Sequence, residues 1–283
     1  MAEIIDGKKI ADGILSGLRI EISKLKTAGI APRLVVILVG KNPASLSYIR
    51  VKQKRAREVG LRVEVQAYPE NTPQAALQKA IQEFNKQPDV CGILVQLPLP
   101  GHLDKQAVLD SIRPELDVDC LTSGNKQKLI RGEEVPFFPP AVMAVLKILE
   151  VSKVNLAKAN VLIVGSGDLI GKPLAALLLN RKISFKLANR YTENLPELTQ
   201  KADVIIAGAG KPGLITGERV KKGAVVIDAG STGSEKGEVV GDVDFESLVK
   251  KARLLAPVTG GVGPVTVAML LGNVVRSAQR KLA

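Results

Sequence analysis

The sequence predicts an α/β protein of two successive open domains, each with a parallel sheet. Three observations favour this fold class. The chain has 283 residues, enough for two domains of roughly 150 residues each. Short apolar, β-branched runs alternate with segments of helical period almost throughout. Aromatic residues are scarce, with 3 Tyr, 5 Phe and no Trp, so the core must be aliphatic, as it usually is around buried parallel strands.

The first half of the chain predicts three strands with helices between them. Residues 34–39 form an unbroken apolar run, typical of a buried strand, whereas residues 61–68 alternate between apolar and polar. Thr72 and Pro73 predict an N-cap followed by proline in the first turn of a helix. The full set is strands at 34–39, 61–68 and 90–97 and helices at 43–59, 73–84, 103–112 and 140–150.

A polar stretch over 151–158 predicts a link to a second series of elements. We therefore place one domain at 1–150 and another at 151–264. Strands that alternate with helices imply right-handed crossovers, and ligands then bind outside the carboxyl ends of the strands. The second series comprises strands at 160–164, 184–188, 204–207 and 224–228 and a helix at 172–180.

The net charge and the small numbers of cysteine and histidine limit the functions that the protein can have. The net charge of +12 favours anionic partners such as nucleic acid, a membrane surface, or phosphorylated and carboxylated small molecules. Two cysteines and one histidine, the loop residue His102, are too few for a zinc site, so we expect no metal. The N-terminus mixes charges and no apolar run reaches 18 residues, so we expect no signal peptide, no membrane span and a cytoplasmic, reducing location.

Glycines after the strand at 160–164 indicate a dinucleotide site. Gly165, Ser166, Gly167 and Gly171 give the spacing G-x-G-x-x-x-G, one residue longer than the usual fingerprint. Gly165 would make the tight turn, Gly167 would admit a pyrophosphate, and a helix N-terminus near Gly171 would face its charge. A strand-to-helix turn without a ligand is the alternative, but the strand–turn–helix–strand context favours a Rossmann-type domain.

The end of the next predicted strand indicates which dinucleotide is bound. NAD sites usually carry Asp or Glu there for the ribose hydroxyls. This strand ends instead in Asn189 and Arg190. An arginine can accept a 2′-phosphate, so we expect NADP rather than NAD as the cofactor. The alternative is a solvated surface arginine.

Tyr48 and Lys52 lie four residues apart on the helix predicted at 43–59, so they share one face. In a pocket, the ring would pack on a flat ligand while the amine transfers protons. The alternative is a solvated basic face, because further basic residues follow.

Polar residues also mark the carboxyl end of the strand that begins at Val90. Gln96 lies where a ligand is expected, or else it stabilises the loop. Asp117 and Asp119 follow a helix, and a carboxylate there could bind a guanidine-like edge or merely cap a turn.

Taken together, these segments resemble the bifunctional methylenetetrahydrofolate dehydrogenase/methenyltetrahydrofolate cyclohydrolase family. The matches occur in family order and cover nearly the whole chain. The most specific are Gln96-Leu-Pro-Leu-Pro100 and Gly260-Gly-Val-Gly-Pro264. The others are Ser45…Tyr48…Lys52, Asp117-Val-Asp119, the glycine turn ending in Gly171-Lys-Pro173, Gly223-Ala-Val-Val-Ile-Asp228 and Val240-Gly-Asp-Val243.

The resemblance implies a folate-binding catalytic domain over 1–150, to which a last helix at 265–283 returns. It implies a Rossmann domain over 151–264, through which two copies form a homodimer. The implied reactions are hydride transfer from 5,10-methylenetetrahydrofolate to NADP and hydrolysis of the methenyl product to 10-formyltetrahydrofolate. Tetrahydrofolate derivatives are then the partners, with no nucleic acid and no membrane.

The resemblance also implies roles for individual residues. By position, Lys52 matches the family's catalytic lysine and Tyr48 its folate-stacking tyrosine. Gln96 matches the glutamine that holds the lysine, and Asp119 matches the pterin-binding aspartate. Lys52 could accept a proton if burial lowers its pKa towards neutrality. The further substrate-binding residues implied are Gly261 and Pro264.

The chain departs from the family pattern at several positions, mostly around the cofactor. Cys120 replaces the glycine of Asp-Val-Asp-Gly, and Phe138 lies in a segment that has lost a threonine expected near the nicotinamide. Ser166 replaces a phosphate-contacting arginine, and Asn189-Arg190 replaces a His-Ser pair. Arg190 can supply the cation that Ser166 cannot.

Three alternative functions therefore stay open at this point. One is an enzyme that keeps only the cyclohydrolase activity. Another is a non-catalytic folate- or nucleotide-binding paralogue. The third is a basic nucleic-acid-binding module, although the aromatic residues and motifs typical of such modules are missing.

Overall fold

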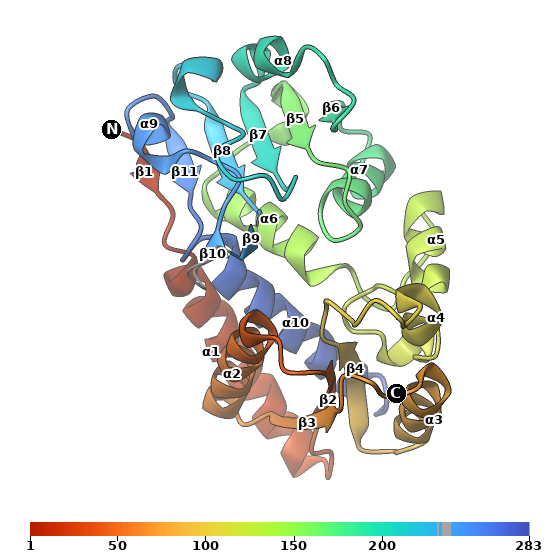
Figure 1. The fold of residues 1–283 in the computed structure, drawn as a ribbon. Coiled ribbons are helices and arrows are strands. Elements are labelled where there is room, and N and C mark those ends of the chain that lie inside the picture. The colour runs from red at the N-terminus through yellow and green to blue at the C-terminus, as the bar shows by residue number, and fades with distance from the viewer. Residues whose placement is uncertain (231, 234–238, 283) are drawn as a thin grey trace. The chain divides into compact units, whose positions relative to one another are not determined.

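The computed structural model describes residues 1–230, 232–233 and 239–282. The chain forms two compact units from interleaved segments (Figure 1). No helix in the described ranges is long and apolar enough to cross a membrane. Unit 1 contains residues 1–11, 129–132 and 141–266, and unit 2 contains residues 12–128, 133–140 and 267–283.

Unit 2 is built on a three-stranded parallel sheet in the order β3-β2-β4. β2 (Arg33–Val39) is central and buried along its whole length, whereas β3 (Arg62–Tyr68) is an edge strand with partly exposed side chains. β4 (Val90–Val95) is buried as well, and Asp117 forms a parallel bridge to Ile93 at its side. The helices are α2 (Pro43–Val59), α3 (Gln74–Asn85), α4 (Lys105–Leu109), the 3₁₀ turn η1 (Pro114–Leu116), most of α5 (Ser123–Arg131) and most of α10 (Val262–Gln279).

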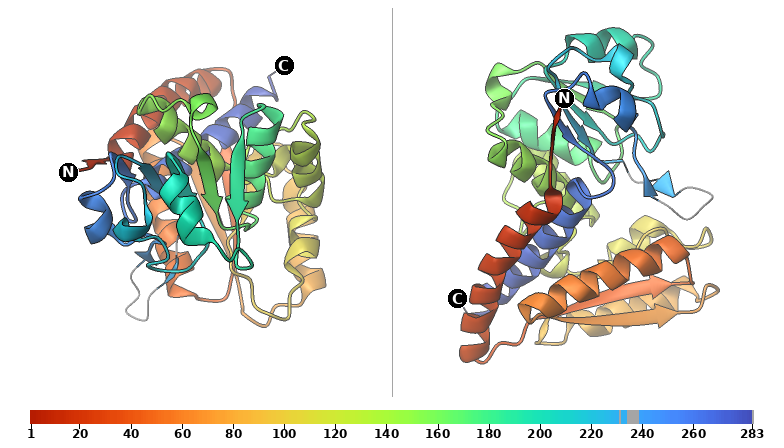
Figure 2. Two further views of the ribbon diagram at one scale, coloured as in Figure 1. Left: turned by 90° about the horizontal axis from the view of Figure 1, so that it is seen from above. Right: turned by 90° about the vertical axis from the view of Figure 1, so that its left-hand side faces the viewer.

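The helix α1 (Gly7–Thr27) begins in unit 1 and continues in unit 2. Within unit 2, α10 lies beside α1 (Figure 2), and Gln279 Nε2 donates a hydrogen bond to Glu21 at 3.0 Å. An aliphatic core cluster joins β2 and β4 to α3 through residues such as Ile37, Ile93 and Ile81, all of which are fully buried. This core supports the carboxyl ends of the strands.

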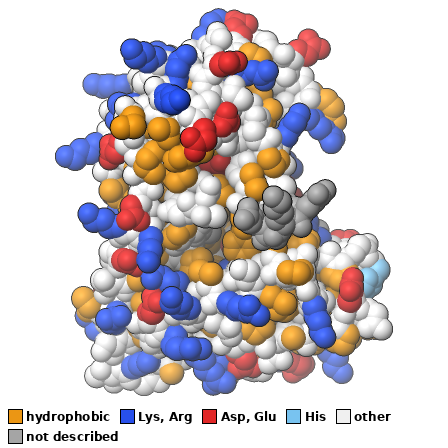
Figure 3. Space-filling model, turned by 60° about the vertical axis from the view of Figure 1, so that its left-hand side comes forward, with side chains coloured by type: hydrophobic (Ala, Val, Ile, Leu, Met, Phe, Trp, Pro, Cys, Tyr) orange, Lys and Arg blue, Asp and Glu red, His pale blue; other side chains and the backbone are white. Residues whose placement is uncertain are grey.

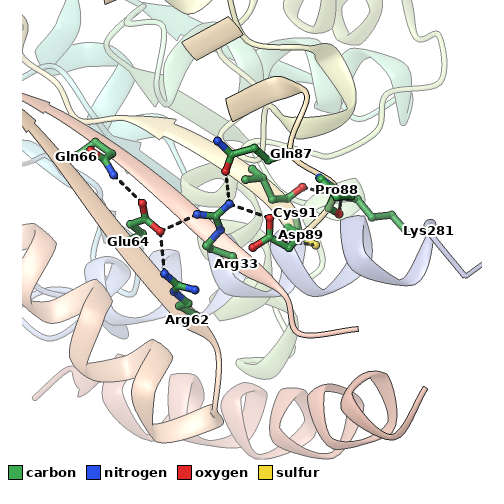
Figure 4. A network of polar contacts seen from close by, with 10 residues as sticks. Arg33, Arg62, Glu64, Gln66, Gln87, Pro88, Asp89, Cys91 and Lys281 are labelled. Atoms are coloured by element: carbon green, nitrogen blue, oxygen red, sulfur yellow. Dashed lines mark hydrogen bonds and ion pairs between the residues drawn. The ribbon is translucent and has the colours of Figure 1, made fainter. Parts of the chain in front are cut away.

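The amino ends of the same three strands carry an ion network around the buried guanidinium of Arg33 (Figure 4). The guanidinium of Arg33 lies 2.7 Å from Glu64 and 2.8 Å from Asp89. The Nζ of Lys281 donates to two backbone carbonyls around the start of β4, each at 2.7 Å. These contacts tie the end of the chain to the sheet.

Unit 1 contains a six-stranded parallel sheet in the order β1-β11-β8-β7-β5-β6. Its strands are β1 (Glu3–Ile4), β5 (Val161–Val164), β6 (Phe185–Ala188), β7 (Val204–Ala207), β8 (Val225–Asp228) and β11 (Leu254–Ala256). Its helices are α6 (Pro140–Val151), α7 (Gly171–Asn180), α8 (Leu195–Lys201) and α9 (Phe245–Val249), with 3₁₀ turns η2 (Leu156–Lys158) and η3 (Gly217–Arg219) and an antiparallel pair, β9 (Thr232–Gly233) and β10 (Val239–Val240). The predicted fold class is confirmed.

Most predicted elements occur close to their predicted positions. α2 coincides with 43–59 and β7 with 204–207. The predicted cap at Thr72 is wrong, because Pro73 has extended backbone angles and is itself the N-cap. The hydroxyl of Thr72 donates instead to the Pro69 carbonyl at 2.7 Å.

Other elements were not predicted, for identifiable physical reasons. α1 contains three glycines, which weaken the helical signal. α8 and α9 have seven and five residues, too few to show a helical period. β1 has two residues and pairs with β11 from the far end of the chain. Because of that pairing, residues 1–11 cluster with unit 1 and not with the residues that directly follow them.

Candidate active site

The helix α2 carries Tyr48 and Lys52 on one face, and the local sequence fixes both of its ends. The side-chain oxygen of Asn42 accepts a hydrogen bond from Ser45 N at 3.0 Å and caps the N-terminus. Gly60 ends the helix in a left-handed conformation, with φ of 79°. Tyr48 is 36% exposed and Lys52 is half-buried. The ring is therefore accessible to a flat ligand, while the amine lies deeper.

Gln96 holds the amine of Lys52 at the carboxyl end of β4. Lys52 Nζ donates to Gln96 Oε1 at 2.9 Å, and Gln96 Nε2 donates to the Leu97 carbonyl at 2.8 Å. The buried hydroxyl of Ser45 donates to the same carbonyl at 3.3 Å. With its NH2 group bound there, Gln96 presents its oxygen to Lys52. An amide oxygen accepts a hydrogen bond from the charged or the neutral amine, so it does not fix the charge.

Burial dominates the titration of both Lys52 and Asp119. Burial lowers the pKa of Lys52, and the charge of Asp119 opposes only part of that shift. Burial raises the pKa of Asp119 to about 6, while the charge of Lys52 opposes the shift and that of Asp117 adds to it. Both groups therefore titrate nearer to neutrality than they would in water.

Asp117 and Asp119 lie two residues apart and differ in their contacts. Asp117 is buried and accepts four hydrogen bonds of 2.7–3.0 Å from Leu121, Thr122 and Asn125. It closes the turn before α5. In the part of the chain that the structure describes, no hydrogen bond reaches the carboxylate of Asp119. Its oxygens are thus available to a ligand.

Cys120 follows Asp119 in a left-handed conformation with φ of 58°. Glycine adopts this conformation without a steric penalty, which explains why a glycine at this position would suit the turn. Cys120 adopts it here although it carries a side chain. The thiol is buried, and burial raises its pKa, with the charges of Asp117 and Asp119 adding to the shift.

In unit 1, the glycine turn adopts the geometry that its spacing predicts. Gly165 has φ of 106°, and a Cβ there would lie 2.3 Å from the Gly208 carbonyl oxygen. A Cβ on Gly171 would lie 1.9 Å from the Gly165 oxygen, so both positions require glycine. Gly167 is exposed, and α7 begins at Gly171. An open backbone ahead of a helix N-terminus fits a pyrophosphate.

Asn189 and Arg190 follow β6 and are exposed. The side-chain oxygen of Asn189 accepts a hydrogen bond from Tyr191 N at 2.9 Å, so this residue shapes the turn. The guanidinium of Arg190 lies 4.8 Å from the centroid of the Tyr191 ring. The exposed charge at this strand end fits a 2′-phosphate. Half-buried Ser166 offers a hydroxyl but no charge.

Gly261 and Pro264 lie around the start of α10, in unit 1. Gly261 N donates to the Pro257 carbonyl at 3.0 Å. A Cβ on Gly7 would lie 1.8 Å from the Gly261 carbonyl oxygen, so two glycines pack here backbone to backbone. Pro264 is half-buried. Close packing of the backbone therefore explains why glycine stands at these two positions. The role of Gly261 and Pro264 in substrate binding stays a prediction.

A buried carboxylate pair in unit 1 was not singled out as functional, although both residues lie in segments that carry the family resemblance. Asp242 accepts hydrogen bonds from the backbone of residues 209–211, in the loop that follows β7. Asp228 accepts three from Gly230, Asp242 and Val243. Burial raises the pKa of Asp228 to about 6. This pair therefore fixes loops at the carboxyl edge of the sheet.

The predicted residues thus form two groups. Tyr48, Lys52, Gln96 and Asp119 belong to unit 2, and the predicted cofactor residues belong to unit 1. The ring of His102 contacts the Thr72 carbonyl at 3.1 Å, in a loop. The described residues contain no group of three His, Cys, Asp or Glu side chains placed to hold a metal ion.

Comparison with known proteins identifies matching domains in both halves of the chain. Residues 5–119 match the catalytic domain of tetrahydrofolate dehydrogenase/cyclohydrolase. Residues 139–282 match the NAD(P)-binding domain of the same family. Because both domains match, the comparison does not favour an enzyme with the cyclohydrolase activity alone.

Individual relatives align over nearly their whole length. The bifunctional protein FolD of Moorella thermoacetica is 43% identical over 279 residues, which are 99% of each chain. The crystal structure of the FolD enzyme from Campylobacter jejuni superposes with a TM-score of 0.94 at 39% identity, covering 99% of both chains. The Trypanosoma brucei FolD structure, a complex with NADP and an inhibitor, also has a TM-score of 0.94, at 37% identity, covering 99% of this chain and 98% of that one.

Proposed function

Since this chain belongs to the tetrahydrofolate dehydrogenase/cyclohydrolase family, we propose that it oxidises 5,10-methylenetetrahydrofolate with NADP and hydrolyses the methenyl product to 10-formyltetrahydrofolate. The observation that carries the proposal is the contact of 2.9 Å between Lys52 and Gln96, beside the unbonded carboxylate of Asp119. A buried amine held by a neutral amide suits proton transfer. Both reactions belong to one-carbon metabolism.

The oxidation depends mainly on orientation. Bound NADP accepts the hydride, and the cation that remains is delocalised over two folate nitrogens. Tyr48 presents an accessible ring for stacking, and Asp119 accepts hydrogen bonds from the N–H groups of the pterin. In unit 1, the turn from Gly165 to Gly171 would hold the pyrophosphate, and Arg190 the 2′-phosphate.

The hydrolysis needs a proton acceptor. Neutral Lys52 takes a proton from water as the water oxygen bonds to the methenyl carbon. The resulting ammonium returns a proton to one folate nitrogen as the bond between that nitrogen and the carbon breaks. The hydroxyl that water supplied releases its remaining proton to solvent as its oxygen becomes the carbonyl oxygen, which leaves the formyl group on the other nitrogen. Gln96 orients the amine in both states because its oxygen accepts from either form.

A single assay tests both activities. The protein is mixed with 5,10-methylenetetrahydrofolate and either NADP⁺ or NAD⁺, and the methenyl absorbance is followed as it rises and decays. We expect a rise with NADP⁺ and a decay faster than the uncatalysed rate. A rise without accelerated decay would contradict the role of Lys52, and no rise with either nucleotide would contradict the dehydrogenase assignment.

Cofactor preference is tested at Arg190. Arg190→Ala should raise the KM for NADP⁺ by about tenfold or more, because a charge-assisted contact with the 2′-phosphate is lost, and it should leave the KM for NAD⁺ almost unchanged. Equal shifts in both values, or a wild-type preference for NAD⁺, would contradict this assignment.

Homodimerisation through unit 1 is also part of the proposal. β6 is an edge strand of the six-stranded sheet, and Leu187 on it is 40% exposed. Leu179, near the end of α7, is 65% exposed. An edge strand and exposed leucines on β6 and α7 favour association. Leu187→Lys should shift the mass measured by light scattering from dimer to monomer, and a monomeric wild type would contradict the proposal.

Location and other partners complete the proposal. Cys91 and Cys120 are both free thiols, which supports a reducing compartment such as the cytoplasm. On the face drawn in Figure 3, Lys and Arg side chains are interspersed with Asp and Glu among the described residues. A face on which charges of both signs are mixed does not form the basic stripe that is typical of a nucleic-acid interface.

A further inference from the structure

We infer that Asn273, on the C-terminal helix α10, is a positioning residue for Asp119 and therefore for folate binding. This inference rests on the proposed function, because Asp119 is the group proposed to bind the pterin. Asn273 is buried in unit 2, with 6% of its surface exposed. Nothing in the sequence singled it out.

The amide of Asn273 connects two loops that are distant in the sequence. Its Nδ2 donates to the carbonyl of Val118 at 2.8 Å and to the carbonyl of Phe138 at 3.0 Å. The two hydrogens of one NH2 group thus serve one carbonyl each. Val118 directly precedes Asp119, so the first bond fixes the backbone from which the carboxylate projects.

Packing around Val118 leaves that backbone little other freedom. A Cβ on Gly92 of β4 would lie 2.7 Å from a Val118 methyl group and 3.2 Å from a methyl group of Val274. Gly92 therefore lets the loop and α10 approach the strand closely. Val118 is fully buried, and the parallel bridge between Ile93 and Asp117 aligns the same segment with β4.

The neighbouring contacts hold every part of this segment except the side chain of Asp119. Asp117 is fixed by its bonds to the turn before α5, and Val118 by α10. Asp119 has no comparable bond among the described residues, so its position follows from the backbone on either side. Removal of the Asn273 amide would release Val118 and take this donor from the buried Val118 carbonyl and from the carbonyl of half-buried Phe138.

The two carbonyls that Asn273 binds also belong to the two segments of unit 2 where this chain departs from the pattern expected for its family. Cys120 lies two residues after Val118, and Phe138 supplies the second carbonyl itself. One buried amide thus fixes both altered segments together. Small losses of alignment at a binding group reduce affinity strongly, since hydrogen bonds depend on direction.

The test compares Asn273→Leu, which keeps the number and branching of the side-chain heavy atoms and removes the donors, with Ser277→Ala. Ser277 lies one turn further along α10, is equally buried, and donates to the Glu115 carbonyl at 3.3 Å. For Asn273→Leu we expect the Kd for tetrahydrofolate and the KM for the methenyl substrate to rise about tenfold or more. The pH at half-maximal cyclohydrolase activity should shift as well. Ser277→Ala should lower the Tm and leave these three quantities unchanged.

Unchanged Kd and KM in Asn273→Leu, or equal changes in Ser277→Ala, would overturn the inference. If Asn273→Leu does not fold, Asn273→Ser decides, because its hydroxyl can serve only one carbonyl. An unchanged Kd in that variant would also overturn the inference. Calorimetric binding of tetrahydrofolate separates this outcome from the proposed function. A wild type that binds folate without turnover contradicts only the proposed reactions, whereas a wild type that does not bind it contradicts both.

Discussion

The two ends of the sheet in unit 2 each hold a buried cation, but the partners of the two cations differ. At the amino ends, Arg33 faces Glu64 and Asp89 at 2.7 and 2.8 Å. At the carboxyl end, Lys52 donates to the neutral oxygen of Gln96 at 2.9 Å. Burial opposes the charge of Arg33, but its bonds to the two carboxylates outweigh burial and raise its pKa. For Lys52 burial prevails, and its pKa is lowered.

Because of this difference, one cation stabilises the structure and the other can transfer a proton. A guanidinium keeps its charge in proteins, and the carboxylates that contact Arg33 hold that charge in place, so Arg33 serves as a structural tie. An amide that contacts Lys52 fixes its position and leaves its proton free to move. The two roles therefore differ because a buried lysine beside an amide can lose its proton, whereas an arginine between carboxylates cannot.

Replacement of Lys52 should have the largest effect and tests the chemical side of the comparison. In Lys52→Met the proton acceptor is lost, so the rate of methenyltetrahydrofolate hydrolysis should fall by roughly 10²- to 10⁴-fold. The absorbance decay of the methenyl compound measures this rate. Because Met places no charge in the buried site, the Tm of the variant should not fall below that of wild type. A wild-type rate in this variant would exclude Lys52 as the acceptor.

Replacement of Arg33 tests the structural side. Arg33→Met should lower the free energy of unfolding by about 3 kcal/mol. This value lies at the lower end of the range for breaking a buried ion pair, because Glu64 and Asp89 are 23% and 50% exposed and water can solvate them. Urea unfolding measures the change. The hydrolysis rate per folded molecule should stay within about twofold of wild type. A large loss of activity at unchanged stability would reverse the assignment.

Asp119→Asn is expected to have an intermediate effect. The change keeps the shape of the side chain and replaces an acceptor oxygen by a donor. A hydrogen bond to a charged group contributes about 1.5–3 kcal/mol, so the affinity for tetrahydrofolate should fall roughly ten- to hundredfold, as measured by calorimetry. An unchanged affinity would mean that the turn at Cys120 does not present Asp119 to the ligand.

The same variant predicts a change in the pH dependence of stability. The pKa of Asp119 is about 6 in the folded protein, above its value of about 3.9 in an unfolded chain. Between these values the folded state binds more protons, so the contribution of Asp119 to stability falls as pH rises from about 4 to 6. The free energy of unfolding of Asp119→Asn minus that of wild type should therefore be larger at pH 7 than at pH 4.5. Equal differences at both pH values would contradict this.

Cys120 should have the smallest effect. In Cys120→Gly the strain of the left-handed conformation, about 1 kcal/mol, is relieved, but the unfolded chain gains a similar amount of entropy. Stability should thus change by less than about 1 kcal/mol, and the KM for folate should stay within about twofold. The control Cys120→Val places a β-branched residue at φ of 58° and should destabilise the protein more than the glycine variant does. Equal stabilities would show that the turn is not restrictive.

Some of these features could be predicted from the sequence because their signals are local. Pro43 near the start of α2 and the helical spacing after it fix the face that carries Tyr48 and Lys52. Gln96 directly follows an apolar strand, which places it at a carboxyl end. Other features depend on pairing across the chain. The sequence does not distinguish Asp117 from Asp119 by itself, and only the contacts of Asp117 with the turn before α5 do so. The hydrogen bond from Asn273 to Val118 joins residues that are 155 positions apart.

The interleaved order of the segments also determines when the site can form during synthesis. The ribosome releases β1 first, but its partner β11 follows some 250 residues later. Lys52, Gln96 and Asp119 emerge in the first half, whereas α10 emerges last. A growing chain would thus carry these three residues and Tyr48 before the helix that bonds Val118 exists. A stalled or truncated chain would leave β4 uncovered beside Gly92, exposing apolar surface that chaperones or proteases recognise.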